Sequence, residues 1–283
     1  MSSDKAEHSI AFAGIPGANA DLVCRVHYPY LDPVAVPEFE DVFEAVERGD
    51  VKYGLIPIEN SQAGRVAEIH SLLPGTRLHI IAEHWHRIEH QLFGIKGAEL
   101  KDLHEVYSHT QALMQSRKQI RKLGLEARMH PDTAMAGRDV AEWADKSKGA
   151  ICSELAGKLY GLDLLKRNVE DDETNHTLFV TISREPVDVA PETEYVLTSL
   201  IFTARSIPAS LYKCLSGFAT NGVNIIKLES YLVKSLRGAA QFFITFEGNP
   251  SEKRVQLALE ELGFFSQKTQ ILGVYPADIK RYQ

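Results

Sequence analysis

The feature that most constrains the fold is a change in the order of the predicted elements along the chain. Between Ile10 and about Val180, short apolar runs typical of strands alternate with segments of helical periodicity, as in "SIAFAG", "FEDVFEAVERGD" and "VKYGLIPI". Strands that alternate with helices predict a largely parallel sheet with both faces covered by helices. We therefore expect an α/β fold for this part of the chain.

The segment "SREPVDVAPETEY" interrupts the alternation, because it has two prolines, several acidic residues and no periodicity. Beyond it we expect a strand, a helix, two strands, a helix and a strand, at residues 196–203, 208–220, 223–233, 239–247, 251–262 and 269–275. Ser251 is the expected N-cap of the second helix. This β-α-β-β-α-β order is the ferredoxin-like plan. We predict a first domain at residues 1–186, a linker at 187–194 and a second domain at 195–283.

Composition narrows the function classes. The 283 residues carry a formal net charge of −7 and no basic block longer than "KQIRK", so nucleic acid is not expected as a partner. No run of ~18 apolar residues indicates a membrane span, and "MSSDKAEHS" lacks the apolar core of a signal peptide. Cys24, Cys152 and Cys214 have no paired spacing and are expected to be buried, reduced thiols. These features predict a soluble, cytoplasmic protein.

A polar loop, "PIENSQAG", follows the apolar strand "VKYGLIPI". In open α/β sheets, ligands bind at the carboxyl ends of the strands, where helix N-termini and backbone N–H groups converge. Asn60 and Ser61 are therefore candidates to face a ligand. The alternative interpretation is that one of them caps the following helix.

Two further segments place polar side chains near strand ends. In "VYSHTQALMQSR", Ser108 and Gln111 fit a capping box, whereas Gln115 lies two turns later and faces either a groove or solvent. In "EDDETNHTLFV", the acidic run is typical of a solvated turn. Thr177 follows it at the start of a strand, and alternation directs the side chains of Thr177 and Leu178 to opposite faces.

The segment "EHWHRIEH" was considered as a metal site, because His84, His86 and His90 would share one face of an extended segment. No cysteine or carboxylate pattern completes a ligand set, so packing or solvent-facing histidines are the favoured interpretation and no metal is expected. The loop "GIPGAN" lacks both the Lys-Ser/Thr pair and the third glycine of nucleotide-binding loops.

Several motifs occur in order along nearly the whole chain: "AFAGIPGAN", "GLIPIENSQAGRV", "VYSHTQALMQSR", "DTAMAG", "ELAGKLYGLDLL", "NHTLF" and "GVNIIKLES". With them the sequence resembles a prephenate dehydratase with a C-terminal regulatory ACT domain. The resemblance implies two α/β lobes like those of a periplasmic binding protein, at about 9–83 with 165–183 and at 84–164. It also implies an active site in the cleft between the lobes. No chorismate mutase helix precedes the first strand, which implies the monofunctional form.

The resemblance assigns roles to individual residues. Its catalytic positions fall on Thr177, Ser108, Asn60 and Gln115, with Thr177 the most closely tied to catalysis. Its substrate-binding positions fall on Gly14, Gly17, Asn19, Ser61, Arg65, Thr133 and Asn175. Prephenate would lose its ring hydroxyl and its ring carboxylate, as carbon dioxide, to give phenylpyruvate. A Thr177 hydroxyl would donate a hydrogen bond to the leaving oxygen, and no metal or organic cofactor is expected.

The sequence also departs from the family pattern. Leu178 stands where the family has arginine, and Ala18, Asn19 and Ala20 replace its Thr-Tyr-Ser. Losing one charged hydrogen bond costs about 1.5 to 3 kcal/mol. Arg65 is therefore a candidate partner for the substrate anion.

The second domain would bind phenylalanine as a feedback effector between two subunits, which implies a homodimer or homotetramer. The effector positions fall on Ala209, Ser210, Leu211, Asn221, Gly222, Asn224, Glu229 and Ser230. Two alternatives remain open: dehydration of arogenate, and a weakened paralogue that senses an aromatic amino acid or keto acid.

Overall fold

The structure, a computed structural model, describes residues 6–190, 192–232 and 240–282. Contacts divide the chain into two compact units, Met1–Val66 with Trp85–Phe179 and Ala67–His84 with Val180–Gln283. The division into domains at a linker of residues 187–194 remains a prediction, and residue 191 of that linker lies outside the described residues.

The first sheet has the strand order β2-β1-β3-β11-β5, with the short β4 paired to β3. Its strands and neighbouring helices are β1 (Ser9–Ala13), α2 (Asn19–His27), β2 (Asp32–Val36), α3 (Phe39–Arg48), β3 (Tyr53–Asn60), β4 (Gly64–Arg65), α4 (Ala67–Leu72), β5 (His79–Arg87) and β11 (His176–Ser183). β1 runs parallel to β2 and β3, as expected for this alternation. α3 ends at Gly49, which adopts φ 77° as a left-handed C-cap.

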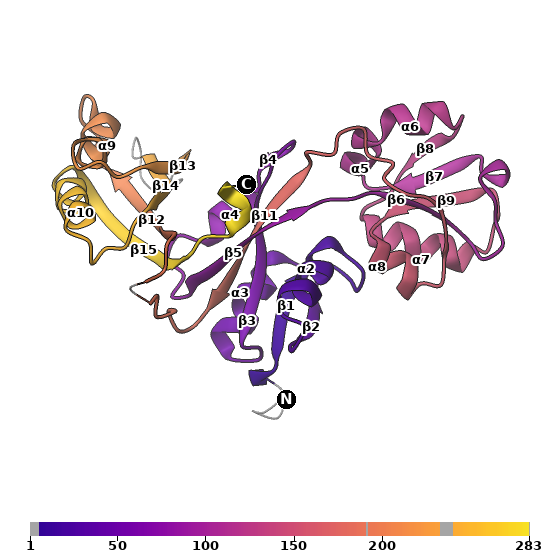
Figure 1. Cartoon of the computed structure of the whole chain (residues 1–283), viewed down its shortest axis with the longest axis horizontal. Helices are drawn as coiled ribbons and strands as arrows, with labels where there is room; N and C mark the ends of the chain where they lie inside the picture. Colours follow the sequence, from indigo (N-terminus) through magenta and orange to yellow (C-terminus); the bar gives the residue numbers. More distant parts are fainter. Residues whose placement is uncertain (1–5, 191, 233–239, 283) are drawn as a thin grey trace. The chain divides into compact units, whose positions relative to one another are not determined.

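The second sheet has the order β10-β6-β9-β7-β8 (Figure 1). Its elements are β6 (Gln91–Gly94), a 3₁₀ turn η1 (Leu100–Asp102), β7 (Glu105–Ser108), α5 (Thr110–Gln115), α6 (Arg117–Lys122), β8 (Glu126–Met129), α7 (Thr133–Trp143), β9 (Lys148–Cys152), α8 (Glu154–Leu159) and β10 (Asp163–Lys166). β7 is parallel to β8 and β9, whereas β6 is antiparallel to β9 and β10. The expectation of a largely parallel sheet therefore holds for only half of this sheet.

The apolar periodicity of "SHTQALMQSRKQIRKLG" predicts one continuous helix, and this prediction is wrong, because the chain breaks at Ser116 between α5 and α6. Asp171, far along the chain, forms hydrogen bonds on both sides of the break. Its carboxylate accepts the backbone N–H groups of Lys118 and Gln119, which gives α6 an N-terminal cap of its own. Its backbone N–H donates to the carbonyl oxygen of Gln115 at 2.6 Å.

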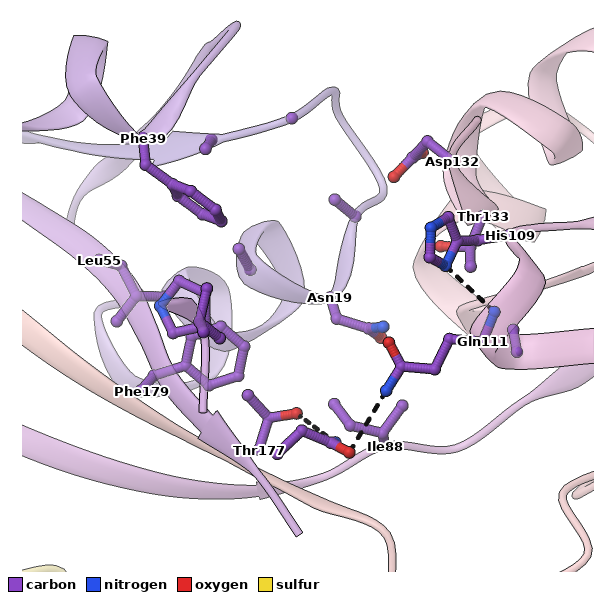
Figure 2. A pocket seen from close by; sticks show the side chains of 18 of the residues that line it. Asn19, Phe39, Leu55, Ile88, His109, Gln111, Asp132, Thr133, Thr177 and Phe179 are labelled. Carbon is purple, nitrogen blue, oxygen red and sulfur yellow. Dashed lines mark hydrogen bonds between the residues drawn. The ribbon is translucent and has the colours of Figure 1, made fainter. Parts of the chain in front are cut away.

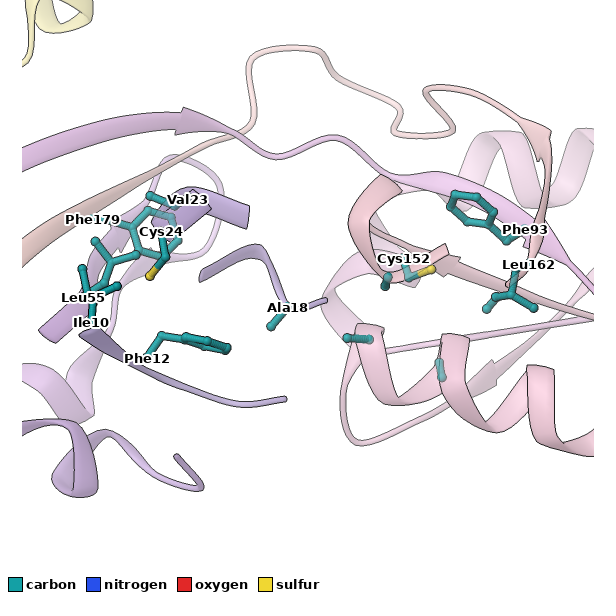
Figure 3. Packing of buried hydrophobic residues seen from close by; sticks show 14 of the residues in the cluster. Ile10, Phe12, Ala18, Val23, Cys24, Leu55, Phe93, Cys152, Leu162 and Phe179 are labelled. Carbon is teal, nitrogen blue, oxygen red and sulfur yellow. The ribbon is translucent and has the colours of Figure 1, made fainter. Parts of the chain in front are cut away.

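Both sheets of the first unit share a hydrophobic core (Figure 3). Ile10, Phe12 and Leu55 belong to the first sheet, and Phe93 and Cys152 belong to the second. The three cysteines of the chain are buried and free, as expected, and burial raises the pKa of the Cys24 and Cys152 thiols far above their ordinary value.

The C-terminal module consists of β12 (Val196–Ala204), α9 (Ser210–Thr220), β13 (Ile225–Leu232), β14 (Ala240–Glu247), α10 (Lys253–Phe265), β15 (Ser266–Pro276) and a final 3₁₀ turn η2 (Ile279–Tyr282). Its antiparallel order β13-β14-β12-β15 and its two helices match the predicted ferredoxin-like plan. The N-cap of α10 is Glu252, so the assignment of that role to Ser251 is wrong. Residues 233 and 239, a predicted strand end and strand start, lie outside the described residues.

The two faces of this module's sheet have different covers. α9 and α10 pack on one face through residues such as Phe218 and Leu262. On the other face, the ring of His70 in α4 packs edge-on against the ring of Phe243, with 5.3 Å between the ring centroids. A Cβ atom at Gly273 would lie 2.0 Å from the carbonyl oxygen of Ile80, so only glycine fits there.

Candidate functional site

A cavity of about 570 Å³ lies within the first unit (Figure 2). Strands β1, β3 and β11 of the first sheet contribute to its lining, and so do α5 and the start of α7, which pack beside the second sheet. The polar lining consists of Asn19, Glu38, Asn60, His90, His109, Gln111, Gln115, Asp132, Thr133, Asn175 and Thr177. Asn19, Gln111 and Thr177 come from three different elements and point into the same space (Figure 2). This volume suits a small organic molecule.

Asn60, at the end of β3, is held in one orientation by the polypeptide backbone. Its Oδ1 accepts the N–H groups of Gln62 at 3.1 Å and Ala63 at 2.9 Å. Its Nδ2 must therefore be the donor, and it donates to Thr177 Oγ1 at 3.0 Å and to Asn175 Oδ1 at 2.8 Å. The expected alternative, in which Asn60 or Ser61 caps the next helix, is not what the structure contains, because α4 begins at Ala67.

The orientation of the Asn60 amide determines which atoms donate and which accept in the side chains bonded to it. Because Asn175 Oδ1 accepts from Asn60, Asn175 Nδ2 is a donor, and it donates to Gln115 Oε1 at 3.1 Å. His90 Nε2 lies 2.9 Å from the same Gln115 oxygen, which can only accept, so Nε2 carries the hydrogen. We call Thr177, Asn60, Asn175, Gln115 and His90 the amide chain.

His90 is 3% exposed, and its backbone N–H donates to Glu170 Oε2 at 3.0 Å. Burial lowers the pKa of its imidazole, while the hydrogen bond to Gln115 and the nearby Glu170 carboxylate oppose that change. The ring is therefore neutral in the empty cavity at neutral pH, with the hydrogen on Nε2 and the lone pair on Nδ1.

Strand alternation brings Thr177 and Phe179 to the cavity, whereas Leu178 is buried and does not line it. This agrees with the expectation that Leu178 points away from Thr177. Because Thr177 Oγ1 accepts a hydrogen bond from Asn60, its own hydrogen remains available to a molecule in the cavity.

The loop between β1 and α2 forms another part of the wall. Gly14 lines the cavity with φ 119°, a backbone conformation that favours glycine. Ser153 and Tyr160 donate hydrogen bonds of 2.6 Å to the carbonyl oxygens of Gly17 and Pro16, respectively, which ties the loop to α8. Gly17 does not line the cavity, and a Cβ atom there would lie 2.8 Å from Ala156 Cα.

The N-terminus of α2 faces the cavity through Ala18, Asn19 and Ala20. Among the described residues no side chain caps this helix, so its first backbone N–H groups can bind an anion. Two other helix starts at the cavity are already capped. The Glu38 capping box closes α3, and Asp132 Oδ1 accepts the N–H groups of Ala134 and Met135 in α7.

Besides Gly17, three residues that sequence reasoning placed at the site do not line the cavity: Ser108, Ser61 and Arg65. Ser108 is fully buried, and its hydroxyl donates to the carbonyl oxygen of Ile151 at 2.6 Å. Its predicted capping box is wrong, because the N-cap of α5 is His109, whose Nδ1 accepts the Gln111 N–H. Ser61 is exposed and bonded to the backbone of the segment that precedes β11. Arg65 is exposed in β4.

Negative charge dominates the titratable lining. Glu38 and Asp132 contribute carboxylates, and no lysine or arginine lines the cavity among the described residues. The nearby Arg87 pairs with the buried Glu170 at 3.2 Å. Within the described part of the chain, no group of three histidine, cysteine or carboxylate residues could hold a metal ion. No helix of residues 6–190, 192–232 or 240–282 is long and apolar enough to cross a membrane.

Sequence reasoning did not assign five of the polar lining residues of the described chain to the site: Glu38, His90, His109, Gln111 and Asp132. Of these residues, only His90 is marked by a sequence pattern, because it belongs to the histidine-rich segment "EHWHRIEH" that was weighed as a metal site. Asn19, Thr133 and Asn175, in contrast, line the cavity as the resemblance implied.

A second cavity of about 490 Å³ lies in the C-terminal module, beside the start of α9. Ser210 and Leu211 line it, and the preceding Ala209 is left-handed with φ 58°. The other predicted effector residues do not line it: Asn221, Gly222, Asn224, Glu229 and Ser230. Asn221 is the C-cap at the opposite end of α9, which is about 16 Å long at 1.5 Å per residue.

Residues 10–187 match the profile of a family described as prephenate dehydratase. The chain is 43% identical over 271 residues to a Komagataeibacter europaeus protein named bifunctional N-acyl-homoserine lactone acylase/prephenate dehydratase, with 96% of each chain covered. It is 35% identical over 292 residues to arogenate dehydratase/prephenate dehydratase 1, chloroplastic, of Arabidopsis thaliana, covering 98% of this chain and 74% of the relative.

Two solved structures resemble the chain closely. One, described as GqqA, a novel type of quorum quenching acylase, has a TM-score of 0.91 at 43% identity and covers 96% of this chain and 99% of its own. The other is the prephenate dehydratase of Arthrobacter aurescens in complex with L-Phe, with a TM-score of 0.86 at 26% identity, covering 95% and 90%.

Proposed function

Because the chain belongs to the prephenate dehydratase family, we propose that its cavity binds prephenate and converts it to phenylpyruvate, carbon dioxide and water. The observation that carries this proposal is the bond between Asn60 and Thr177, two residues 117 positions apart in the sequence. It leaves the Thr177 hydroxyl hydrogen without an acceptor among the described residues, at the wall of a cavity of suitable size.

The chemistry needs few protein groups. When the C–C bond to the ring carboxylate breaks, its electron pair enters the ring and the ring hydroxyl departs, so aromatisation drives both losses. In our proposal Thr177 donates a hydrogen bond to the departing oxygen, where negative charge develops. Gln115 Oε1 accepts two bonds from the protein, so its amide hydrogens are available to the same ligand.

We assign one substrate carboxylate to the start of α2. The backbone N–H groups there are uncapped, and Asn19 adds an amide. Backbone donors at a helix N-terminus bind anions without a cation. They would replace part of what the family obtains from its hydroxyl residues and its arginine. Arg65 is not part of this assignment, because it does not line the cavity.

Arogenate is a second candidate substrate, because its amine would meet the carboxylates of Asp132 and Glu38 in a cavity whose described lining has no lysine or arginine. Some curated relatives are named arogenate dehydratases, including one from Petunia hybrida at 33% identity. The Asp132→Asn variant tests this, since asparagine caps α7 equally well. If the amine binds Asp132, the variant lowers kcat/KM for arogenate about 10- to 150-fold relative to prephenate, the value of one charged hydrogen bond.

The Komagataeibacter europaeus relative is also named as an acylase. An acylase that works through a serine or threonine nucleophile needs a hydroxyl activated by a neighbouring base. The hydroxyls of this cavity belong to Thr133 and Thr177, and among the described residues neither is hydrogen-bonded to a histidine or a carboxylate. We therefore extend only the dehydratase activity to this chain.

A side-by-side assay tests the proposal. Prephenate and arogenate are supplied separately to the purified protein, and the appearance of phenylpyruvate and phenylalanine is followed. Formation of phenylpyruvate from prephenate is the expected result. A folded protein that leaves both substrates unchanged would falsify the proposal and favour a ligand-binding sensor.

We also propose that the C-terminal module is an ACT-type regulatory domain that binds phenylalanine, in a homodimer or homotetramer. Support comes from its ferredoxin-like order and from the cavity lined by Ser210 and Leu211. Phenylalanine should raise the melting temperature, because a ligand that binds only the folded state stabilises it. No change at millimolar phenylalanine would contradict this assignment.

A further inference from the structure

The proposed reaction consumes one proton. A prephenate dianion and one proton give the phenylpyruvate monoanion, carbon dioxide and water, so the departing hydroxide must be protonated at some stage. A threonine hydroxyl is too weak an acid to supply that proton, although it can donate a hydrogen bond. A general acid with a pKa near the working pH performs this step best, and histidine is the side chain most often used.

Among the residues that the structure describes, four titratable side chains line the cavity: Glu38, His90, His109 and Asp132. Glu38 is exposed and closes the capping box of α3. Asp132 is committed to the cap of α7 through Oδ1. His109 is exposed at the start of α5, and its Nδ1 accepts the Gln111 N–H. The remaining candidate is His90.

The geometry of His90 suits a proton donor. It is nine-tenths buried yet lines the cavity, and its Nε2–H is fixed on Gln115. Among the described residues, Nδ1 has no hydrogen-bond partner. The amide chain fixes which nitrogen carries the hydrogen, because Asn60 is anchored on the backbone and each later partner follows from it. Any proton that the ring gains must therefore bind at Nδ1.

We propose that His90 donates the proton that the reaction consumes. Nδ1 takes up a proton from solvent as the substrate dianion binds, and it transfers this proton to the ring hydroxyl as the C–O bond breaks. The electron pair of that bond leaves with the oxygen, which departs as water, and Nδ1 regains its lone pair. This role rests on the proposed dehydratase function.

The charges around His90 make its protonation depend on the ligand. Glu170 contacts its backbone N–H but is itself paired with Arg87, and Asp171 caps α6 behind Gln115. The other titratable side chains that line the cavity are those of Glu38, Asp132 and His109. Burial keeps the pKa of the empty site low, whereas a bound dianion in the same cavity raises it.

The pH dependence of kcat/KM for prephenate tests the proposal. In the wild type, kcat/KM should fall about tenfold per pH unit above the pKa of His90 in the free enzyme, because the protonated ring is required. The His90→Gln variant keeps a donor for Gln115 but cannot carry the proton. It should lose about 100- to 10,000-fold in kcat and show no such dependence.

Two further variants separate a catalytic role from a structural one. Gln115→Glu places a carboxylate against Nε2, which stabilises the charged ring, so the break in the profile should move to higher pH. His109→Gln should keep the wild-type break, whatever its rate. If Gln115→Glu leaves the break unchanged, or if wild type and His90→Gln share one profile, the role of His90 is rejected while the dehydratase function stands. If wild type does not act on prephenate at all, both proposals fail.

Discussion

Two of the buried polar assemblies in the described part of the chain differ in charge. In the first unit, the amide chain from Thr177 to His90 is neutral. In the second unit, Glu83 is 3% exposed and forms an ion pair with Arg281 of the C-terminal turn. Both assemblies join residues that are far apart in the sequence.

The two assemblies differ in the hydrogen-bonding groups that remain available to a ligand. Arg281 donates from Nε at 2.8 Å and from Nη2 at 2.6 Å to the two oxygens of Glu83, and the Asp278 N–H adds a third bond. That pair is a closed structural contact. The amide chain ends in a Thr177 hydrogen and in Gln115 amide hydrogens that have room to bind a ligand. We infer that of these two assemblies the charged one serves stability, whereas the neutral amide chain serves binding.

The sharpest test of this contrast is Thr177→Val, which removes a hydroxyl at nearly constant volume. We expect kcat to fall about 100- to 1000-fold, the effect of removing one donor from a developing negative charge. Stability should change little, because Asn60 Nδ2 keeps Asn175 and the His176 carbonyl as acceptors. Steady-state kinetics and thermal melts provide the measurement.

Thr181→Val is the matched control for that variant. It makes the same change on the same strand, at a buried hydroxyl that lies 3.3 Å from His84 Nε2. It should cost about 1 kcal/mol of stability and leave kcat intact. Equal losses of kcat in both variants would show that the strand, and not the hydroxyl of Thr177, matters.

Arg281→Met should have the opposite signature, with a loss of stability and no change in chemistry. Removing one partner leaves the Glu83 charge buried and unpaired, which costs about 3 to 5 kcal/mol. The double variant Glu83→Gln with Arg281→Met should recover part of that loss, because no charge then remains buried. Urea unfolding measures both. A single variant as stable as wild type would remove the contrast between the two assemblies.

The neutral state of His90 predicts a pH dependence of stability in the absence of substrate. Burial places the folded-state pKa below the ordinary 6.5, so the unfolded chain binds the proton more tightly. Stability should therefore fall as pH drops from 6.5 towards the folded-state pKa, by up to about 1.4 kcal/mol per pH unit, and no further below it. His90→Gln should remove this contribution. Urea unfolding of both proteins across that window decides, and identical slopes would mean that folding does not lower the pKa of His90.

Local signals predicted most helices and the strands with apolar runs. α3 was predicted correctly, because its sequence has one apolar helical face and is followed by Gly49, which is the C-cap of the helix. β2 was not predicted, since Pro33 weakens its strand signal, and β8 was not predicted because every residue of Glu126–Met129 is exposed. The break at Ser116 is flanked by hydrogen bonds from Asp171, a long-range contact that no local pattern contains.

The candidate site shows the same limit. The family resemblance assigned Asn60, Gln115, Asn175 and Thr177 to one site. In the structure, hydrogen bonds connect all four. Ser108 was assigned by the same reasoning, but its side chain is bonded to the carbonyl oxygen of Ile151 and does not line the cavity. The direction of this side chain depends on its position in the strand, which the residue type does not reveal. His90 could not be assigned from sequence, because its hydrogen-bond role exists only through Gln115.

The smallest effect is expected where the amide chain meets the helix break, at Asp171. Asp171→Ala removes the side-chain cap of α6 but keeps the backbone bond to the carbonyl oxygen of Gln115. Loss of a cap costs about 1 kcal/mol, so unfolding by urea should show that decrease. Asp171→Asn, which can still accept these N–H groups, is the matched control. Because the Gln115 side chain is held by Asn175 and His90, kcat should stay within about twofold of wild type, since less than 0.5 kcal/mol of positioning is lost. A larger loss of kcat in Asp171→Ala than in Asp171→Asn would mean that the cap of α6 positions the amide chain, and that stability and binding are less separate in this unit than the contrast with Glu83 and Arg281 implies.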